Sequence, residues 1–401
     1  MRTLSLAKIA VVGVAGALAL SACSNSSSNN NSGLSGGGNS SGANNSSGGT
    51  YTIAFQGPLS GDNQQLGINE VNAVQLAIDQ ANKANLGFTL KLLKADDQGD
   101  PSKAPAAAAQ VLQDNTVVGE IGPSFSGATK AVGKTYGAAG LAMISPSATN
   151  PSLSTLGFQT FHRIVPSDNV EGTQAADWLA KKVKKLYVID DLSDYGKGVA
   201  DAVQKEAQAK GVTVVRTGVD AKTTDYSAAA TAVKTSGAGA LFYGGYDAQA
   251  ALFAKALNAI NYTGIKIGGN GIKSSVFTKQ AGSAGNGWYF SCGCLDATTA
   301  PAAKDFAAAY QAAFNTPPST YSPEAYDATN AMIQAIKDAK SKGSITKASV
   351  ETAVNALDYQ GITTEVKFET NGEVVATAQT VNLFTQKNGE IVLLGNMKDQ
   401  N

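Results

Sequence analysis

The sequence predicts an α/β fold made of two doubly wound parallel-sheet lobes. Short apolar segments with the alternation of strands are separated by alanine-rich segments with helical periodicity, which is the pattern of β-α-β units. The pattern starts again after residues 163–166, so we expect two successive blocks of this kind. About 350 residues follow position 50, and this length suffices for two domains of ordinary size.

The first block opens with residues 50–55, an apolar strand followed by a Gly-Pro pair. Val71, Val74 and Ile78 then fall at helical spacing, residues 88–92 alternate as a strand does, and Pro101 stands where a helix begins. The same criteria predict the remaining elements of this block, which are strands over 117–121 and 141–144 and a helix over 126–139.

The second block repeats this alternation before the chain changes character. Two further helices are expected to begin near Pro301 and Pro323, because proline suits the first turn of a helix. Asn371-Gly372 and Asn388-Gly389 predict hairpin turns. The expected strands of the second block are 185–190, 212–217, 240–243 and 265–268, and its expected helices follow residue 196 and cover 227–235 and 247–261.

Open parallel sheets bind ligands at the carboxyl ends of their strands. In this sequence those ends carry hydroxyl, aromatic and amide side chains in both blocks. A catalytic triad or a histidine metal cluster is excluded, because His162 is the only histidine. The Asp96-Asp97 pair is interpreted as a capping or solvated pair at a strand end. We therefore expect a binding protein without a cofactor, and not an enzyme.

Motifs in order along the chain resemble those of the leucine/isoleucine/valine-binding family, the type I periplasmic binding proteins that serve ABC importers. The resemblance covers about residues 51–396 and implies two lobes joined by three crossings, near 163–166, 291–301 and 368–375. It assigns 51–165 and 298–370 to lobe 1, and 166–297 and 371–401 to lobe 2. The residues that carry it are Gly57-Pro58-Leu59-Ser60-Gly61, Asp96-Asp97, Asp100-Pro101, Ile144-Ser145-Pro146-Ser147-Ala148-Thr149-Asn150-Pro151, Asp194-Tyr195-Gly196 and Tyr243-Gly244-Gly245-Tyr246.

The resemblance also implies a binding cleft between the lobes. Ser126 opens a predicted helix, so its hydroxyl and the nearby N–H groups are expected to hold a carboxylate. Ser147 is expected to offer a backbone carbonyl, and Thr149 a hydroxyl and an N–H. Aromatic rings are expected against the ligand at Tyr195, Tyr246 and Tyr321. Each hydroxyl also fits a cap or turn residue, and each tyrosine a half-buried packing residue.

Two departures from the family pattern affect the expected ligand. Asn270 stands where the family usually has an acidic residue that pairs with a ligand ammonium. Asp247 is the nearest substitute by sequence, although it also fits a helix cap. Leu66 stands where classical members have an aromatic ring on the wall of the cleft. The sequence therefore predicts an amino-acid-like ligand and leaves open a small organic acid or amide.

The first 50 residues predict export and attachment to a membrane. Arg2 and Lys8 precede a short apolar run, residues 9–20. The Leu-Ser-Ala sequence directly before Cys23 resembles the bacterial lipoprotein box. We expect residues 1–22 to be a signal peptide and Cys23 to carry a lipid anchor; an ordinary signal peptide with an incidental cysteine is the alternative. Residues 23–50 consist almost entirely of Ser, Asn and Gly after the cysteine, which predicts a disordered tether.

Charge and cysteine content narrow the expected partners. The 31 basic and 31 acidic residues balance, so we expect no nucleic-acid partner. Cys292 and Cys294 form a Cys-Gly-Cys pair, for which a disulfide, two free thiols or a metal site remain open.

The predicted function is that of an extracytoplasmic, membrane-anchored solute receptor. We expect a monomer that binds a small molecule similar to branched-chain amino acids and delivers it to the membrane subunits of an ABC permease. A sensor that binds such a ligand and signals to a membrane partner is the alternative, because fold alone does not determine function.

Replacement of Cys23 with serine tests the predicted anchor. The Cys23→Ser protein has no thiol for lipid attachment, so it should stay unprocessed or leave the membrane fraction. Cell fractionation and mass spectrometry of the N-terminus measure both outcomes, and Cys292→Ser is the matched control that should keep the anchor. Normal processing of Cys23→Ser together with its retention in membranes would contradict the prediction.

Overall fold

The computed structural model describes residues 48–400. The predicted signal peptide, Cys23 and nearly all of the predicted tether lie outside the described residues and stay predictions. Within residues 48–400, no helix has the length and apolar character that crossing a membrane requires. The described chain forms an α/β structure with two large sheets, as the sequence predicts.

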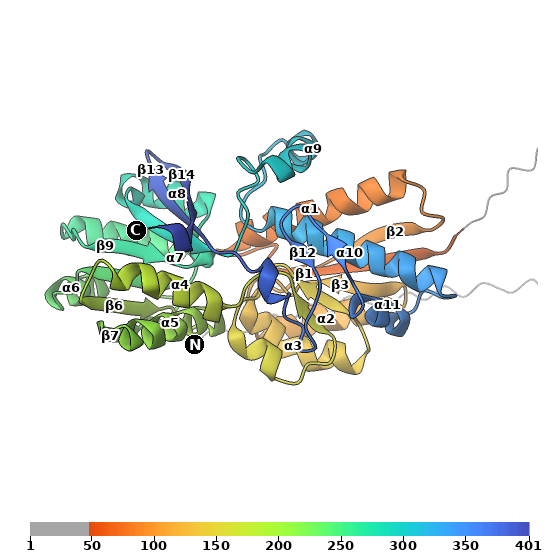
Figure 1. Ribbon diagram of the computed structural model, residues 1–401, viewed down its shortest axis with the longest axis horizontal. Helices are drawn as coiled ribbons and strands as arrows, with labels where there is room; N and C mark the ends of the chain where they lie inside the picture. Colours follow the sequence, from red (N-terminus) through yellow and green to blue (C-terminus); the bar gives the residue numbers. More distant parts are fainter. Residues whose placement is uncertain (1–47, 401) are drawn as a thin grey trace, which may run out of the picture. The chain divides into compact units, whose positions relative to one another are not determined.

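The first sheet is parallel throughout and has the strand order β2-β1-β3-β4-β5. Helices cover both of its faces, so the sheet forms the middle layer of lobe 1 (Figure 1). Its strands are β1 (Thr50–Gly57), β2 (Thr89–Asp96), β3 (Val117–Ile121), β4 (Met143–Ser145) and β5 (Phe161–Arg163). The helices are α1 (Gln64–Lys83), α9 (Lys304–Phe314), α10 (Ser322–Ser341) and α11 (Lys347–Val354) on one face, and α2 (Ala104–Gln113) and α3 (Ser126–Ala138) on the other.

The alternation of side chains along β1 explains this two-sided packing. Ile53 and Phe55 enter the apolar cluster formed with α1 and α10, whereas Ala54 between them enters the cluster formed with α2 and α3. All three side chains are fully buried. Successive strand residues point to opposite faces, and a parallel sheet covered on both faces therefore needs a continuous apolar run.

The second sheet forms lobe 2 and has the order β14-β13-β10-β9-β8-β6-β7. Its strands run parallel from β7 to β10, and β13 and β14 add an antiparallel edge. The strands are β6 (Lys185–Asp190), β7 (Thr213–Gly218), β8 (Ala240–Gly244), β9 (Ile265–Gly268), β10 (Trp288–Cys292), β13 (Asn382–Lys387) and β14 (Glu390–Asn396). The helices are α4 (Asp168–Ala180) and α5 (Asp194–Ala209) on one face, and α6 (Ser227–Thr235), α7 (Asp247–Ala259) and α8 (Ser275–Ala281) on the other. The short strands β11 (Tyr359–Gln360) and β12 (Glu365–Val366) form a separate pair.

The chain passes between the two lobes after β5, after β10 and between β12 and β13. In the first passage, Ile164 belongs to the core of lobe 1 and the next residue, Val165, to the core of lobe 2. In the second passage, a disulfide joins Cys292 to Cys294, and Asn382 of the third passage donates from Nδ2 to the Cys294 carbonyl at 3.0 Å. The passages thus contact one another, and the predicted residue limits of the lobes stay a prediction.

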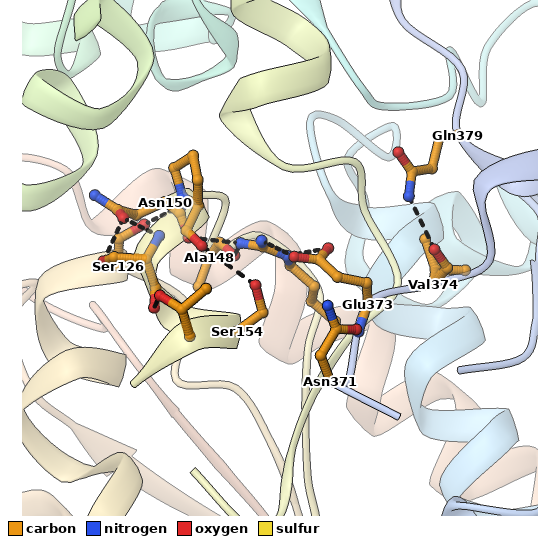
Figure 2. A network of polar contacts seen from close by, with 12 residues as sticks. Ser126, Ala148, Asn150, Ser154, Asn371, Glu373, Val374 and Gln379 are labelled. Carbon is orange, nitrogen blue, oxygen red and sulfur yellow. Dashed lines mark hydrogen bonds and ion pairs between the residues drawn. The ribbon is translucent and has the colours of Figure 1, made fainter. Parts of the chain in front are cut away.

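A buried ion pair joins the first passage to the third. Arg163 is fully buried, its Nε donates to Glu373 Oε2 at 2.8 Å, and a second nitrogen pairs with Glu373 Oε1. The remaining nitrogen donates to the carbonyls of Ala148, at 3.1 Å, and Asn150, at 2.8 Å. Figure 2 shows these groups in one polar network that reaches Ser126, whose hydroxyl accepts a hydrogen bond from the Asn150 N–H at 3.1 Å.

Most predicted elements lie where the structure has them. The turn predicted at Asn388-Gly389 joins β13 to β14, and both residues have positive φ, 54° and 83°. The turn predicted at Asn371-Gly372 also reverses the chain, with an antiparallel bridge between Phe368 and Val374 across it, although no longer strand pair follows. The sequence did not reveal β5, α4, α8, β10 and α11.

Removal of the buried guanidinium should be costly. Arg163→Met leaves the Glu373 carboxylate and two loop carbonyls without their donor, and we expect the free energy of unfolding to fall by about 3 kcal/mol or more. Urea denaturation at neutral pH measures this change. Lys210→Met is the control, because it removes only the surface ion pairs with Asp177 and Glu206, and it should cost less than ~1 kcal/mol. Equal, small losses in both variants would contradict the prediction.

Candidate functional site

Residues of both lobes enclose a small cavity near the carboxyl ends of the parallel strands. Its volume is about 10 Å³, which is room for a single water molecule. The lining residues are Leu66, Phe125, Ser126, Ser147, Tyr195, Tyr246, Asn270, Gly271 and Tyr321. The sequence had singled out all of these except Phe125 and Gly271, and the structure therefore brings most of the predicted residues together.

Hydrogen-bond donors characterise the lobe 1 wall of the cavity. Ser126 is the first residue of α3, and no side chain caps this helix. Because the Ser126 hydroxyl accepts a hydrogen bond from Asn150 N–H, its own proton is free to be donated. Ser147 donates from its hydroxyl to the Ser124 carbonyl at 2.7 Å. A helix N-terminus with an adjacent hydroxyl is suited to an anion such as a carboxylate.

Thr149 lies beside the cavity and not in its wall. Its carbonyl accepts a hydrogen bond from the Asp168 N–H at 2.8 Å, and its buried hydroxyl has no hydrogen-bond partner. The Asp168 carboxylate is fully buried, lies close enough to this hydroxyl for the hydroxyl to lower its pKa, and forms no ion pair with a lysine or arginine of residues 48–400. Burial, and next the negative charge of Glu171, raise the pKa of Asp168 well above its usual value.

Aromatic rings form the seam between the lobes. The Tyr195 oxygen accepts a hydrogen bond from Gly271 N–H at 3.0 Å, and the Tyr195 ring lies 5.2 Å from that of Tyr246. Tyr246 in turn stacks on Phe125 of lobe 1, with 4.3 Å between ring centroids and 18° between ring planes. The stacked pair closes the cavity on this side, and it must separate before a ligand larger than water can reach the lining residues.

Asn270 contacts a buried carboxylate that the sequence had not indicated. Its backbone N–H donates to Glu171 Oε1 at 2.9 Å, and its side-chain Nδ2 donates to Glu171 Oε2 at 2.8 Å. The Ser291 hydroxyl donates to Oε1 as well, at 2.9 Å. Burial raises the pKa of Glu171 to about 7, although these hydrogen bonds act in the opposite direction. An acidic group therefore stands directly behind the neutral amide.

Asp247, in contrast, is not brought into the cavity. It is the first residue of α7, its Oδ1 accepts a hydrogen bond from the Ala248 N–H at 2.8 Å, and Ser274 lies near it. Burial raises the pKa of Asp247 to about 6. The two apolar wall positions do line the cavity: Leu66 is buried on α1, and Tyr321, which precedes α10, has a buried hydroxyl without a partner.

The sequence reading missed Asp168 and Glu171 because it did not recognise α4. This helix packs against α5 and buries polar residues, among them Asp168, Glu171 and Gln174, so it lacks the polar outer face of an ordinary surface helix. A signal was nevertheless present. Asp168 and Glu171 follow Pro166 closely and stand three positions apart, so they share one face of a first helical turn. Buried acids of this kind indicate a functional site.

The two acids in the first turn of α4, Asp168 and Glu171, have no basic partner in the described part of the chain. Among residues 48–400, no lysine or arginine lies within 4.0 Å of either carboxylate. Arg163 is close enough to lower the pKa of Asp168, but its nitrogens are bound to Glu373 and to the loop carbonyls. One end of the site is therefore negative, and the other, at α3, presents hydrogen-bond donors.

Known proteins share this architecture. Residues 50–390 match the family model described as periplasmic binding protein. The chain is 32% identical over 348 residues to the Leu/Ile/Val-binding protein BraC3 of Rhizobium johnstonii, covering 85% of this chain and 93% of that protein. The branched-chain amino acid transporter substrate binding protein LivJ of Streptococcus pneumoniae, solved with isoleucine, has a TM-score of 0.78 at 25% identity, over 86% and 99% of the two chains. A solute binding protein of an ABC transporter from R. palustris, solved with benzoate, has a TM-score of 0.78 at 19% identity over 87% and 96%, which shows the fold alone.

Two α/β lobes joined by three passages, with a site between them at the strand ends, define a solute-binding protein. The chain belongs to the leucine/isoleucine/valine-binding family of type I periplasmic binding proteins. Its matched relatives are solute-binding proteins and not enzymes, and the family is extracytoplasmic and works with ABC permeases.

Buried acids make the stability of the protein depend on pH. Burial raises the pKa of Glu70, which accepts a hydrogen bond from Ser124, to about 8, and those of Glu324 and Glu351 to about 7. Between pH 5 and 8 the folded protein thus holds protons that the unfolded chain has released, so the free energy of unfolding should fall as pH rises, by on the order of 1 kcal/mol or more.

Urea denaturation of the ligand-free protein at pH 5.5, 6.5 and 7.5 measures this dependence. Glu70→Gln removes the acid with the highest of these pKa values and should flatten the profile, whereas Glu390→Gln changes an exposed acid and should not. Stability that rises with pH over this range would contradict the prediction.

Proposed function

We propose that the protein binds an α-amino acid with an apolar side chain, of the branched-chain type, and delivers it to an ABC permease. The observation that carries the proposal is the Asp168 carboxylate, which is fully buried and forms no ion pair with a lysine or arginine among the described residues. A buried charge of this kind is costly unless an opposite charge accompanies it. A ligand ammonium supplies that charge, and the relatives named above as Leu/Ile/Val-binding support this ligand class.

The rest of the site suits the other two parts of such a ligand. The uncapped N-terminus of α3 and the Ser126 hydroxyl offer donors to a carboxylate. Leu66, Phe125 and Tyr246 offer apolar surface to a side chain. In this proposal Asp168 takes the role that the sequence had suggested for Asp247, because Asp168 acts electrostatically on Tyr195, Tyr246 and Tyr321, which line the cavity.

Binding requires that the lobes part and close again. The cavity of about 10 Å³ cannot hold an amino acid. Apart from the stacked Phe125–Tyr246 pair, the seam contains an ion pair between Lys130 and Asp194 at 2.7 Å and a hydrogen bond from Asn150 Nδ2 to the Asp194 carbonyl at 2.5 Å. Ligand contacts with both lobes select the closed arrangement over the open one through a hinge motion at the three passages.

The predicted signal peptide, lipid anchor and tether support a location for this activity outside the cell membrane. A lipid on Cys23 and a Ser/Asn/Gly tether would hold the receptor at the outer face of the membrane, within reach of the permease. A ligand sensor with the same binding site is distinguished from a transport component by uptake of radiolabelled leucine in cells with and without the protein.

A second ligand class is a small organic acid or amide without an ammonium. The neutral Asn270 in the cavity wall favours it, and so does the raised pKa of Asp168, because a protonated Asp168 needs no cation. The two classes differ in one functional group, so matched ligands decide between them.

Replacement of Asp168 should abolish the preference for an amine. Asp168→Asn keeps the shape of the side chain and removes the charge, and we expect the affinity for leucine to fall at least about 100-fold. The affinity for 4-methylpentanoate, which lacks the amine, should change by no more than about threefold. Isothermal titration calorimetry at pH 7.5 measures both ligands.

Two further variants complete this experiment. Asp247→Asn should leave leucine binding unchanged, because the Asp247 carboxylate is bound to the Ala248 N–H of its own helix and to the Ser274 side chain. Ser126→Ala should weaken leucine and 4-methylpentanoate alike, by about 1.5–3 kcal/mol, because both ligands carry the carboxylate. Loss of leucine binding in Asp247→Asn with retention in Asp168→Asn would reject the proposed ammonium partner, and wild-type binding of the acid alone would reject the amino-acid class.

A further inference from the structure

The orientation of the Asn270 amide is determined by its neighbour. Glu171 Oε1 accepts hydrogen bonds from the Asn270 N–H and the Ser291 hydroxyl, and Oε2 of the ionised carboxylate offers the Asn270 side chain an acceptor. The amide nitrogen therefore faces Glu171, at 2.8 Å from Oε2. The amide oxygen is turned the other way and accepts no hydrogen bond from the described residues, although Asn270 lines the cavity.

The charge behind the amide acts on the cavity. Of all charged groups, Glu171 has the largest electrostatic effect on the hydroxyls of both Tyr195 and Tyr321, which line the cavity with Asn270. Glu171 itself is 1% exposed and, within residues 48–400, pairs with no lysine or arginine. Its hydrogen-bond donors are all uncharged groups, so its negative charge is not neutralised by the described part of the protein.

We propose that Glu171 is the positioning residue that makes the site select a protonated amine: it holds the Asn270 oxygen toward the ligand and supplies, through this amide, the negative charge that a carboxylate at position 270 would supply directly. The proposal rests on the proposed function and deepens it. An amide whose N–H groups are bound to a carboxylate is polarised, and its oxygen becomes a stronger acceptor for a cationic donor. Asp168 and Glu171 together thus surround the amine end of the site.

This pairing of Glu171 with Asn270 explains how a neutral residue can replace an acidic one in the cavity wall. A carboxylate at 270 in addition to Glu171 would place two like charges in contact, and one of them would have to take up a proton. With asparagine at 270, one charge is retained, every donor and acceptor between the two side chains is matched, and the charge is kept one side chain away from the cavity.

The test exchanges the two side chains. In Glu171→Gln the charge is lost and one amide must turn, so the leucine affinity should fall at least about tenfold, while the 4-methylpentanoate affinity stays within about threefold. In the double variant Glu171→Gln/Asn270→Asp, the introduced glutamine still accepts from the backbone N–H of residue 270 and from Ser291, and it donates to the introduced carboxylate. The charge has moved into the wall, and the leucine affinity should return to within about threefold of wild type.

Calorimetry with leucine and 4-methylpentanoate measures all variants, and thermal unfolding without ligand shows that each is folded. Glu351→Gln is the matched control, because it changes a buried acid of raised pKa on α11, away from the cavity, and it should leave both affinities unchanged. A loss in Glu171→Gln that affects both ligands equally, or a double variant no better than Glu171→Gln, would overturn the proposal. A wild-type protein that binds neither ligand would reject the proposed function and this proposal with it. The two failures are distinguishable, because the outcomes above overturn only the role of Glu171 while wild-type leucine binding is retained.

Discussion

The buried guanidinium of Arg163 is the interaction on which the site depends. It connects the first and third passages through Glu373 and holds the carbonyls of Ala148 and Asn150 in the loop after β4. That loop lies against the first residue of α3, where the donors for a ligand carboxylate are found. Because one rigid planar cation bonds to all three parts, bending at the hinge and the shape of the binding loop cannot change independently.

The parts of the fold that the sequence predicted well have a clear local signal. Strand 185–190 and helix 227–235 are predicted with their observed limits, because each has one period and a marked end. Helix α4 and strand β10 escaped recognition for different reasons. The polar residues of α4 are buried in a site, which removes the amphipathic pattern, and β10 has a parallel neighbour on one side and an antiparallel one, β13, on the other, a pairing that no local pattern contains.

The same distinction applies to the site. Residues at strand ends, such as Ser126, Tyr246 and Asn270, were predictable because the topology of parallel sheets places them at one edge. The acids were not, because Glu171 precedes Asn270 by 99 residues and belongs to the first helix after a lobe crossing. Asp247 was the nearest acid in sequence, but its carboxylate accepts a hydrogen bond from the next N–H of its own helix. Proximity in sequence was therefore the wrong guide to the missing charge.

The buried acids in the first turn of α4 lower the stability of the ligand-free protein, although the proposed function requires them. Asp168 is fully buried without an ion-pair partner among the described residues, and Glu171 lies one turn away on the same helix, so the ligand-free fold carries an electrostatic cost that Thr149 and Arg163 relieve only in part. Selection for a sturdier protein alone would replace Asp168 with a neutral residue. With the proposed ammonium partner, part of the folding free energy is supplied only by the bound ligand, and the loaded receptor is then more resistant to heat and proteases than the unloaded one.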